Sequence, residues 1–290
     1  MDIVDKVNGK TKTFMLFGNP VEHSFSPVLQ NTVAKAMGID SVYSAVKVDD
    51  IGAAVKGAYA MGIKGINVTV PYKKDVMEYL CGIDKRAQAI GAVNTLKYTE
   101  NGYYGYNTDI TGLKLTLETR GITVKGKTIV VIGAGGAARA AVAMALSEEA
   151  GKVYIINRTI EKAEEIKESL NKYFEGNIIC GGYDVLDTIN EKMIIIQTTS
   201  VGMGEGVWES PVKNTDIFKN TEVLVDIVYN PLKTKIMADA ENYGVKAFNG
   251  LDMLIYQGIA SFEIWNEITV DYETKLALRD ALTSFYGRGK

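Results

Sequence analysis

The chain has 290 residues, 47% of them hydrophobic, so it can bury a sizeable core; its length favours one large or two ordinary domains, and we predict two. Its 32 basic and 35 acidic residues leave a net charge of −3 without a basic stripe, which argues against nucleic acid as a partner. No apolar stretch approaches membrane-spanning length, and the N-terminus "MDIVDKVNGK" carries acids where a signal peptide needs a positive start, so we expect a cytoplasmic protein without a membrane partner.

The cysteine and histidine content limits the chemistry further. Cys81 and Cys180 lie far apart in no CxxC pattern, so we expect two buried thiols rather than a disulfide or a thiolate metal site. The single histidine, His23, excludes a His-rich metal site, and we interpret it as structural. We therefore expect no metal, and acid/base chemistry carried by other residue types.

Strand and helix patterns alternate along the chain, which predicts an α/β protein with largely parallel sheets. The first half reads as a strand in "FMLFGNP", a helix in "PVLQNTVAKAMG" that Gly38 ends, a strand in "SVYSAVKV", a strand over 66–70, and a hairpin in "TLKYTENGYYGYN" turning at Asn101-Gly102. A new unit begins near Lys125 with a buried strand, a glycine turn and a helix of small residues. Further strands are predicted in "KVYIIN", "MIIIQTT", "EVLVDIVY" and "VKAFN", and the last forty residues are helical in pattern.

The stretch "GAGGAA" has the spacing of the dinucleotide-binding fingerprint. Gly133 permits the tight turn, Gly135 lets the backbone approach a pyrophosphate, and Ala138 permits close helix–strand packing, with the anion at the helix N-terminus. The alternative is a purely structural turn between strand and helix. Because the motif follows an apolar strand and opens a helix, we predict nucleotide binding.

The next strand ends in "NRT", where a site that prefers NAD usually has an acidic residue on the ribose. Arg158 stands there instead, and a guanidinium suits a 2′-phosphate, with Lys162 adding a second positive charge one turn later. The alternative is an exposed arginine in a loop. We predict that NADP is preferred over NAD.

Two adjacent lysines follow the strand "INVTV" and Pro71. Val76, Met77 and Leu80 lie three, four and seven residues beyond Lys73, so on a helix Lys73 shares the inward stripe and Lys74 faces solvent. Lys73 is the candidate for proton transfer, against the alternative of a snorkelling lysine. Asp109 in "YNTDITG" is a candidate orienting carboxylate or simply a helix first-turn acid, and spacing alone does not pair the two.

Read together, several motifs resemble shikimate dehydrogenase along nearly the whole chain: "GNPVEHSFSPVLQN", "NVTVPYK", "GAVNTL", "GYNTDITG", "GAGGAAR", "NRT", "TTSVGM", "DIVYNP" and "NGLDMLIYQG". The resemblance implies a substrate-binding catalytic domain formed by residues 1–110 plus 250–290, in which C-terminal helices return to the N-terminal α/β domain, and a Rossmann-type NADP-binding domain over 111–249. Gln30 and Gln197 depart from the common family pattern, which bears on substrate preference.

The resemblance also implies residue roles. Lys73 matches the family's acid/base lysine and Asp109 its paired carboxylate. Ser24, Ser26 and Tyr229 match the group that holds the substrate carboxylate, and Thr69, Asn94 and Gln257 match the ring-hydroxyl contacts. Cofactor contacts fall on the glycine loop, the "NRT" segment and the start of the last helical region: Gly133, Ala134, Gly135, Gly136, Ala137, Asn157, Arg158, Thr159, Lys162 and Gly250.

The implied reaction is NADP-dependent interconversion of 3-dehydroshikimate and shikimate, in a monomer or homodimer. One alternative is a quinate/shikimate dehydrogenase with broader substrate and cofactor use. Others are a non-catalytic sensor of NADP or a metabolite, against which intact Lys73 and Asp109 argue, and another NADP enzyme such as a methylene-tetrahydrofolate dehydrogenase, which would lack the "HSFSP" serines.

Overall fold

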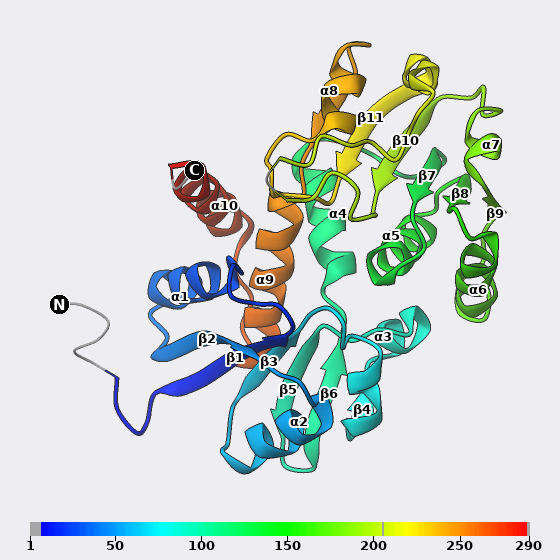
Figure 1. The fold of residues 1–290 in the computed structure, drawn as a ribbon. Coiled ribbons are helices and arrows are strands. Elements are labelled where there is room, and N and C mark those ends of the chain that lie inside the picture. The colour runs from blue at the N-terminus through cyan, green and yellow to red at the C-terminus, as the bar shows by residue number, and fades with distance from the viewer. Residues whose placement is uncertain (1–6, 205, 289–290) are drawn as a thin grey trace. The chain divides into compact units, whose positions relative to one another are not determined.

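The structure, a computed structural model, describes residues 7–204 and 206–288 and divides into two compact units (Figure 1). Unit 1 consists of the described residues up to Thr108 together with those from Ile255 onward, and unit 2 runs from Asp109 to Leu254. The boundary at 254/255 falls inside helix α9 (Leu251–Asn266), so most of this helix belongs to unit 1.

Unit 1 is built on a six-stranded sheet with the order β2-β1-β3-β5-β6-β4. β1 is parallel to both β2 and β3, and β4 is parallel to β6, whereas β5 is antiparallel to β3 and to β6. This sheet is therefore mixed, with more parallel than antiparallel pairings. The antiparallel pairing of β5 with β6 is the predicted hairpin, because a short turn can only return the chain in the opposite direction. The elements are β1 (Lys12–Gly18), α1 (Ser26–Ala36), β2 (Ser41–Lys47), α2 (Ile51–Ala60), β3 (Gly65–Val68), the 3₁₀ helix η2 (Asp75–Tyr79), β4 (Gly82–Ile83), α3 (Lys85–Ile90), β5 (Thr95–Thr99), β6 (Gly102–Tyr106), the greater part of α9, and α10 (Tyr272–Arg288).

Two local predictions in unit 1 need correction. The hairpin turns at Glu100 and Asn101, since Thr99 pairs with Gly102, and of the expected Asn101-Gly102 pair Gly102 alone has a positive φ, of 128°. Strand β3 ends at Val68 rather than Val70. Val70 is 66% exposed, because the chain has already left the sheet before Pro71.

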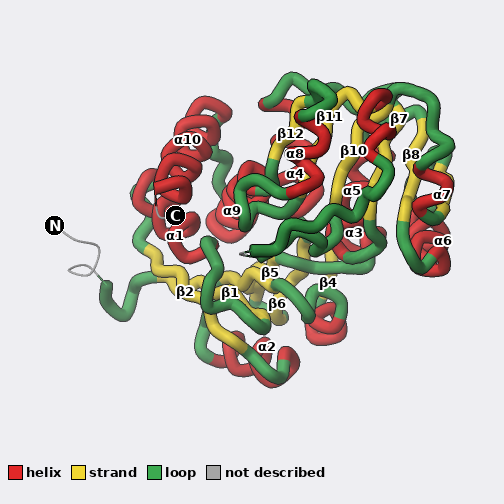
Figure 2. The backbone as a smooth tube through the Cα atoms, turned by 45° about the horizontal axis from the view of Figure 1, so that its top comes forward, coloured by secondary structure: helices red, strands yellow, loops and turns green. Residues whose placement is uncertain are grey.

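Unit 2 has a six-stranded sheet with the order β12-β11-β10-β7-β8-β9, in which every neighbouring pair is parallel. Figure 2 shows β12, β11, β10, β7 and β8 side by side in this order. In chain order this is the 3-2-1-4-5-6 arrangement of a doubly wound dinucleotide-binding fold, whose direction reverses between β7 and β10. Its elements are α4 (Asp109–Thr119), β7 (Thr128–Ile132), α5 (Gly136–Ser147), β8 (Lys152–Ile156), α6 (Ile160–Leu170), β9 (Ile178–Gly181), α7 (Tyr183–Leu186), β10 (Met193–Gln197), the 3₁₀ helix η3 (Thr215–Asn220), β11 (Thr221–Asp226), α8 (Lys235–Glu241), β12 (Lys246–Phe248) and the first turn of α9.

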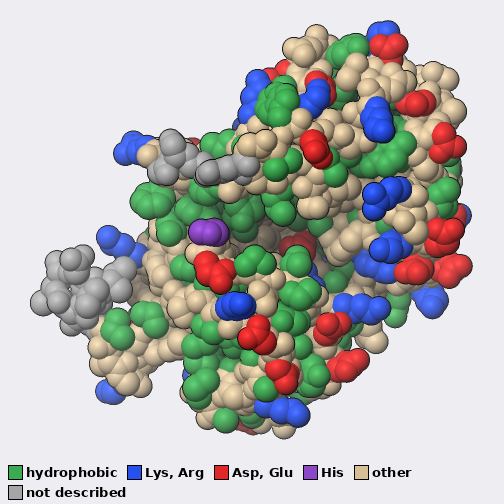
Figure 3. Space-filling view, in the orientation of Figure 1, with side chains coloured by type: hydrophobic (Ala, Val, Ile, Leu, Met, Phe, Trp, Pro, Cys, Tyr) green, Lys and Arg blue, Asp and Glu red, His purple; other side chains and the backbone are tan. Residues whose placement is uncertain are grey.

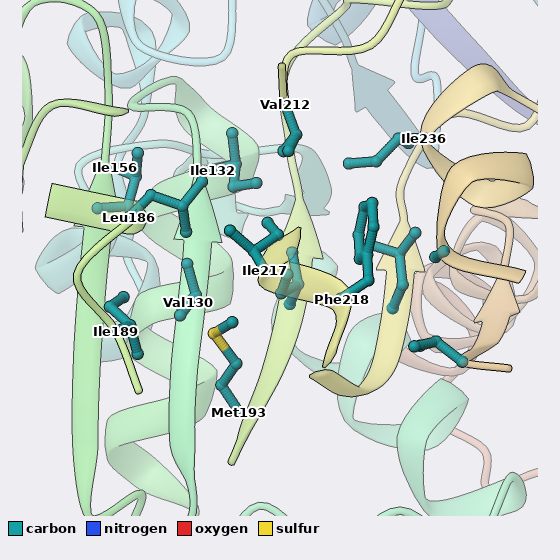
Figure 4. Close-up of a cluster of buried hydrophobic side chains, with 14 of the residues drawn as sticks. Val130, Ile132, Ile156, Leu186, Ile189, Met193, Val212, Ile217, Phe218 and Ile236 are labelled. Atoms are coloured by element: carbon teal, nitrogen blue, oxygen red, sulfur yellow. The ribbon is translucent and has the colours of Figure 1, made fainter. Parts of the chain in front are cut away.

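The core of unit 2 explains why the central strands read as unbroken apolar runs. All five residues of β7 are buried, and so are all five of β10, as expected when helices cover both faces of a parallel sheet. On one face, Val130, Ile132 and Met193 pack with Ile217 and Phe218 of η3 (Figure 4). Helix α5 packs against β7 and β8, where its alanines permit a close approach.

The two cysteines differ from the expected pair of buried thiols. Cys81 is exposed, and its sulfur lies 3.7 Å from the Thr99 hydroxyl. Cys180 is half-buried, and burial raises the pKa of its thiol to about 12, so it stays protonated. His23 is also exposed, and a single histidine is visible on the face shown in Figure 3.

Candidate functional site

Lys73 follows β3 in a turn that precedes η2. Its side chain is half-buried, whereas that of Lys74 is exposed, and Val76 of the expected inward stripe is completely buried. The Lys73 carbonyl accepts a hydrogen bond from the Val93 backbone N–H at 2.8 Å. The turn that carries Lys73 is therefore anchored to the segment that leads into Asn94.

A buried amide, Asn67, connects four elements of unit 1. Its Oδ1 accepts a hydrogen bond from the Tyr43 hydroxyl at 2.8 Å, and its Nδ2 donates to the Ser261 hydroxyl at 3.0 Å and the Thr95 hydroxyl at 3.2 Å. Asn67 is 6% exposed, and Thr95 and Ser261 are fully buried. Because buried polar groups need partners, these hydrogen bonds hold β2, β3, β5 and α9 in a single arrangement.

The same network continues to two of the predicted substrate contacts, Asn94 and Gln257. Asn94 Oδ1 accepts hydrogen bonds from the Thr108 backbone N–H and the Thr95 hydroxyl, both at 2.9 Å. Asn94 Nδ2 lies 3.0 Å from Thr108 Oγ1 and 3.4 Å from Gln257 Oε1. The structure thus brings together Asn94 of the "GAVNTL" motif and Gln257 of the last motif, which are 163 positions apart in the chain.

Ser26 joins this network from the other side. It begins α1 near the Tyr43 hydroxyl. Burial raises the pKa of Tyr43 well above its ordinary value, an effect that the nearby Ser26 side chain opposes. Tyr43 is therefore a neutral phenol that donates to Asn67. Ser24 is half-buried, and its hydroxyl accepts from the Ser26 backbone N–H at 3.2 Å, a local bond in the turn before α1, whose N-cap residue Phe25 makes no side-chain cap.

Thr69 lies directly beyond β3 and is half-buried. Its backbone N–H donates to the Phe17 carbonyl at 2.9 Å, and its methyl group would lie 2.3 Å from a Cβ at Gly18. The missing side chain at the end of β1 therefore leaves the space that Thr69 occupies.

In unit 2 the glycine loop lies at the point where the strand order reverses. Gly133 has a φ of 117°, and a Cβ there would lie 2.6 Å from Thr198 Oγ1 at the end of β10. A Cβ at Gly135 or Gly136 would meet no atom within 4 Å, so the backbone at the N-terminus of α5 is open to a ligand. Open backbone N–H groups at the start of a twelve-residue helix fit a pyrophosphate. Ala138 is fully buried, as close helix–strand packing requires, while Ala134 and Ala137 are half-buried.

The second strand of this fold, β8, ends where the adenosine ribose of a dinucleotide is expected to bind. Arg158, Thr159 and Lys162 are exposed there, and Asn157 Nδ2 donates to the Thr159 carbonyl at 2.8 Å. Burial raises the pKa of Tyr183, and the nearby positive charge of Arg158 opposes that rise. The site is basic, which suits a phosphorylated ribose.

A buried carboxylate organises the loop that carries Tyr229. Asp226, at the end of β11, accepts hydrogen bonds from the Thr234 hydroxyl at 2.6 Å, the Val228 backbone N–H at 3.0 Å and Gln197 Nε2 at 3.2 Å. Gln197 also accepts a hydrogen bond from the Thr199 backbone N–H, so Asp226 and Gln197 together hold the loops after β10 and β11. Tyr229 follows Asp226 by three residues and is half-buried.

Gly250 is required by its backbone surroundings, because a Cβ there would lie 1.9 Å from the Ile227 carbonyl oxygen. Its N–H donates to the Val228 carbonyl at 3.0 Å. Asp109 is the first residue of α4 and is 5% exposed, so it is far more buried than an ordinary first-turn acid.

The predicted residues thus divide between the two units. Unit 1 contains Ser24, Ser26, Thr69, Lys73, Asn94 and Gln257, whereas unit 2 contains Asp109, Tyr229 and all the predicted cofactor contacts. Sequence reasoning missed Tyr43, Asn67, Thr95, Thr108 and Ser261 of the buried network. Asn67, Thr95 and Thr108 could have been found, since each lies within a quoted motif and Asn67 also shares the polar face of its strand with Thr69. Tyr43 and Ser261 lie in none of the quoted motifs.

The described residues form neither a metal-binding cluster nor a membrane-spanning helix. Over residues 7–204 and 206–288, no three His, Cys, Asp or Glu side chains group closely enough to hold a metal ion. Nor does that part of the chain contain a helix long and apolar enough to cross a membrane.

Comparisons with known proteins cover the chain almost from end to end. Residues 16–96 match the shikimate dehydrogenase substrate binding domain, residues 115–236 match the shikimate / quinate 5-dehydrogenase model, and residues 250–274 match the shikimate 5'-dehydrogenase C-terminal domain. The shikimate dehydrogenase (NADP(+)) of Methanocaldococcus jannaschii is 44% identical over 285 residues, which are 96% of this chain and 99% of the relative.

Solved structures agree. A shikimate dehydrogenase in complex with NADP+ matches with a TM-score of 0.83 at 40% identity, covering 96% of each chain. A shikimate 5-dehydrogenase from Listeria monocytogenes, in complex with shikimate and NAD, matches with a TM-score of 0.87 at 30% identity, covering 97% of this chain and 98% of that one. With the doubly wound unit, the buried amide–hydroxyl network and these matches in agreement, the chain belongs to the shikimate dehydrogenase family.

Proposed function

We propose that this protein is an NADP-dependent shikimate dehydrogenase that interconverts 3-dehydroshikimate and shikimate, in the pathway to chorismate and aromatic amino acids. Its relatives carry that name. The observation that carries the proposal is the network in unit 1 from Tyr43 to Gln257, which holds amide and hydroxyl groups in fixed orientations. Such groups suit a ring that carries several hydroxyls.

Substrate binding is assigned to two sets of side chains. Ser24, Ser26 and Tyr229 bind the carboxylate through hydroxyl donors, which need no buried counter-charge. Thr69, Asn94 and Gln257 bind the ring hydroxyls. In support, Thr69 lies beyond a strand end of an α/β sheet, and Asn94 and Gln257 meet at 3.4 Å.

Proton transfer is assigned to Lys73, with Asp109 as the carboxylate that orients it. When bound, NADPH supplies the hydride that reduces the substrate carbonyl carbon. The Lys73 ammonium group donates a proton to the carbonyl oxygen as it becomes a hydroxyl, and in the oxidative direction the neutral amine takes that proton back. The half-buried position of Lys73, beside an exposed Lys74, supports this assignment.

The cofactor is assigned to unit 2. The open backbone at Gly135 and Gly136 receives the pyrophosphate at the N-terminus of α5, within the loop formed by Gly133, Ala134, Gly135, Gly136 and Ala137. Arg158 and Lys162 supply the charge for the 2′-phosphate, Asn157 and Thr159 border it, and Gly250 lies near the nicotinamide end. Because Arg158 and Lys162 are both exposed and basic, NADP is preferred over NAD.

One alternative has specific support: a dehydrogenase that also accepts quinate or NAD. A matching family model is described as shikimate / quinate 5-dehydrogenase, and the Listeria structure contains NAD. The test is the absorbance of reduced nicotinamide when the purified protein meets each pairing of shikimate or quinate with NADP or NAD. Turnover confined to shikimate with NADP is expected. Comparable turnover with quinate or NAD supports the broader enzyme, and NADP binding without any turnover supports a sensor.

We also propose a cytoplasmic enzyme that is a monomer or homodimer. Light scattering coupled to gel filtration distinguishes a mass near 31.6 kDa from twice that value.

A further inference from the structure

The orientation of the Gln257 amide can be derived from a backbone group. The Thr108 backbone N–H can only donate, so the Asn94 atom that it meets at 2.9 Å must be the oxygen Oδ1. Asn94 Nδ2 then lies at the other side of that amide, 3.4 Å from Gln257. Because an amide nitrogen only donates, Gln257 must meet it with its oxygen Oε1, which also accepts from Thr108 Oγ1 at 3.4 Å. The Gln257 NH₂ group therefore lies on the side of its amide away from Asn94 and Thr108.

Ser261 holds the turn of α9 that carries Gln257. Its hydroxyl is fully buried and lies 2.8 Å from Thr95 Oγ1, 3.2 Å from Thr108 Oγ1 and 3.0 Å from Asn67 Nδ2. It also lies 3.0 Å from the carbonyl oxygen of Gln257 itself, one turn earlier in the helix. The same hydroxyl thus touches the backbone of Gln257 and the side chains that orient Asn94.

Gly258, the next residue after Gln257, is also held in place. Gln30 Nε2 donates to the Gly258 carbonyl at 2.9 Å, and a Cβ at Gly258 would lie 2.7 Å from the Leu29 side chain. Helix α1 therefore packs tightly against α9 from one side while Ser261 holds it to β3 and β5. A small displacement of this turn would move Gln257, because Gln257 and Gly258 are adjacent residues of α9 and Ser261 lies one turn later.

We propose that Ser261 is a positioning residue for the substrate, which through Thr95, Thr108 and Asn67 fixes Gln257 so that its NH₂ group donates to a substrate oxygen. This rests on the proposed function. The group that meets Gln257 must accept a hydrogen bond, as a ring hydroxyl or a ketone oxygen does, and a group that can only donate is rejected.

The test compares Ser261→Ala and Ser261→Thr with a matched control, Thr116→Val. Thr116 is 1% exposed in α4 and its hydroxyl bonds the Gly112 carbonyl one turn back at 2.8 Å, so the control also deletes a buried hydroxyl that bonds its own helix. We expect Ser261→Ala to raise KM for shikimate about tenfold or more, with the affinity for NADP within about twofold of wild type. Ser261→Thr, which keeps a hydroxyl, recovers most of that loss, and Thr116→Val leaves KM unchanged.

If Ser261→Ala and Thr116→Val both lower the melting temperature while leaving KM for shikimate unchanged, Ser261 is merely structural and the proposal is overturned. Should Ser261→Thr fail to fold because of its extra methyl group, Thr95→Val takes its place, since it removes the partner hydroxyl without changing the shape of the side chain. It is expected to raise KM for shikimate as Ser261→Ala does, and an unchanged KM overturns the proposal.

The side-chain NH₂ resonances of two residues distinguish a failure of this proposal from a failure of the proposed function. The side-chain NH₂ resonances of Asn94 and Gln257 in the substrate-free protein are expected to shift in Ser261→Ala and not in Thr116→Val. If they do not shift, the positioning role is wrong even when the enzyme turns over shikimate. If they shift but the wild type neither binds nor oxidises shikimate, the network is as described and the proposed function is wrong.

Discussion

Two neighbouring lysines provide the sharpest comparison at the scale of single residues. Lys73 is half-buried and Lys74 is exposed, so replacing each by alanine separates chemistry from charge. A positioned general acid contributes about 10²- to 10⁴-fold, so Lys73→Ala is expected to lose at least about 100-fold in kcat while still binding NADP. Steady-state kinetics with shikimate, together with NADP titration, measure both. Equal activity in Lys73→Ala and Lys74→Ala would show that Lys73 does not transfer the proton.

Arg158 carries the second residue-scale prediction. A hydrogen bond to a charged group contributes about 1.5–3 kcal/mol, which corresponds to about a 10- to 100-fold loss in NADP affinity for Arg158→Ala, with the affinity for NAD nearly unchanged. Lys152→Ala is a suitable control, because Lys152 lies at the other end of β8 and pairs with Glu191 at 2.6 Å. The prediction fails if NADP and NAD weaken to the same extent.

At the scale of the elements, the loops that follow β10 and β11 depend on the buried carboxyl of Asp226. Burial raises the pKa of Asp226 from 3.8 to about 6, against three hydrogen bonds that lower it. The folded protein therefore holds this proton more tightly than the unfolded chain. The stabilisation is complete below about pH 4 and is lost as the pH rises through about 6.

Asp226→Asn removes this titration while keeping the shape of the side chain. Relative to the variant, the wild type is expected to gain on the order of 2–3 kcal/mol in unfolding free energy as the pH falls from 7.5 to about 4, as the difference between the two pKa values requires. Urea unfolding at a series of pH values measures it. If the difference in unfolding free energy between wild type and Asp226→Asn stays constant from pH 7.5 to about 4, Asp226 does not titrate as described.

For the whole molecule, the two units differ in how the chain forms them. Unit 2 is continuous from Asp109 to Leu254, whereas unit 1 needs the residues from Ile255 onward. Trp265 of α9 stacks on Phe14 at 4.8 Å and donates to the Leu96 carbonyl at 2.9 Å. Residues up to 108 by themselves therefore lack the helix that covers this part of the hydrophobic core.

The excised segment 109–254 is therefore expected to unfold cooperatively and to bind NADP, while the segment 1–108 does not unfold cooperatively. Circular dichroism during urea unfolding and NADP titration measure these properties. The control joins residues 255–290 to segment 1–108 through a flexible linker, which should restore a cooperative unfolding transition. A cooperative transition in segment 1–108 by itself would contradict the division.

Local patterns accounted for the elements and for several functional residues. The apolar run of β7 followed by "GAGGAA" predicted a strand, a turn and a helix, because glycine conformations and unbroken apolar strands are local properties of the chain. The hairpin followed from Asn-Gly, although its turn lies one residue earlier, since the strand register and not the dipeptide alone decides which residues form the corner. Lys73 is the more buried lysine, as the spacing of Val76, Met77 and Leu80 predicted, but it lies in a turn before the 3₁₀ helix η2 and not on the helix that the prediction assumed.

By itself, then, the sequence determined the α/β class, the dinucleotide fingerprint, the basic end of β8 and, through separated motifs read together, the family. The return of the final helices to the first domain was implied by that resemblance, although periodicity did not show it. Only the tertiary structure decided that β5 runs antiparallel to β3 and that Ser261, Thr95 and Asn67 meet. The reason is physical: a local sequence pattern does not predict which serine, threonine and asparagine side chains will meet, because their partners lie as far as 194 positions away. Their hydrogen bonds form only when packing of the core brings four elements to one point.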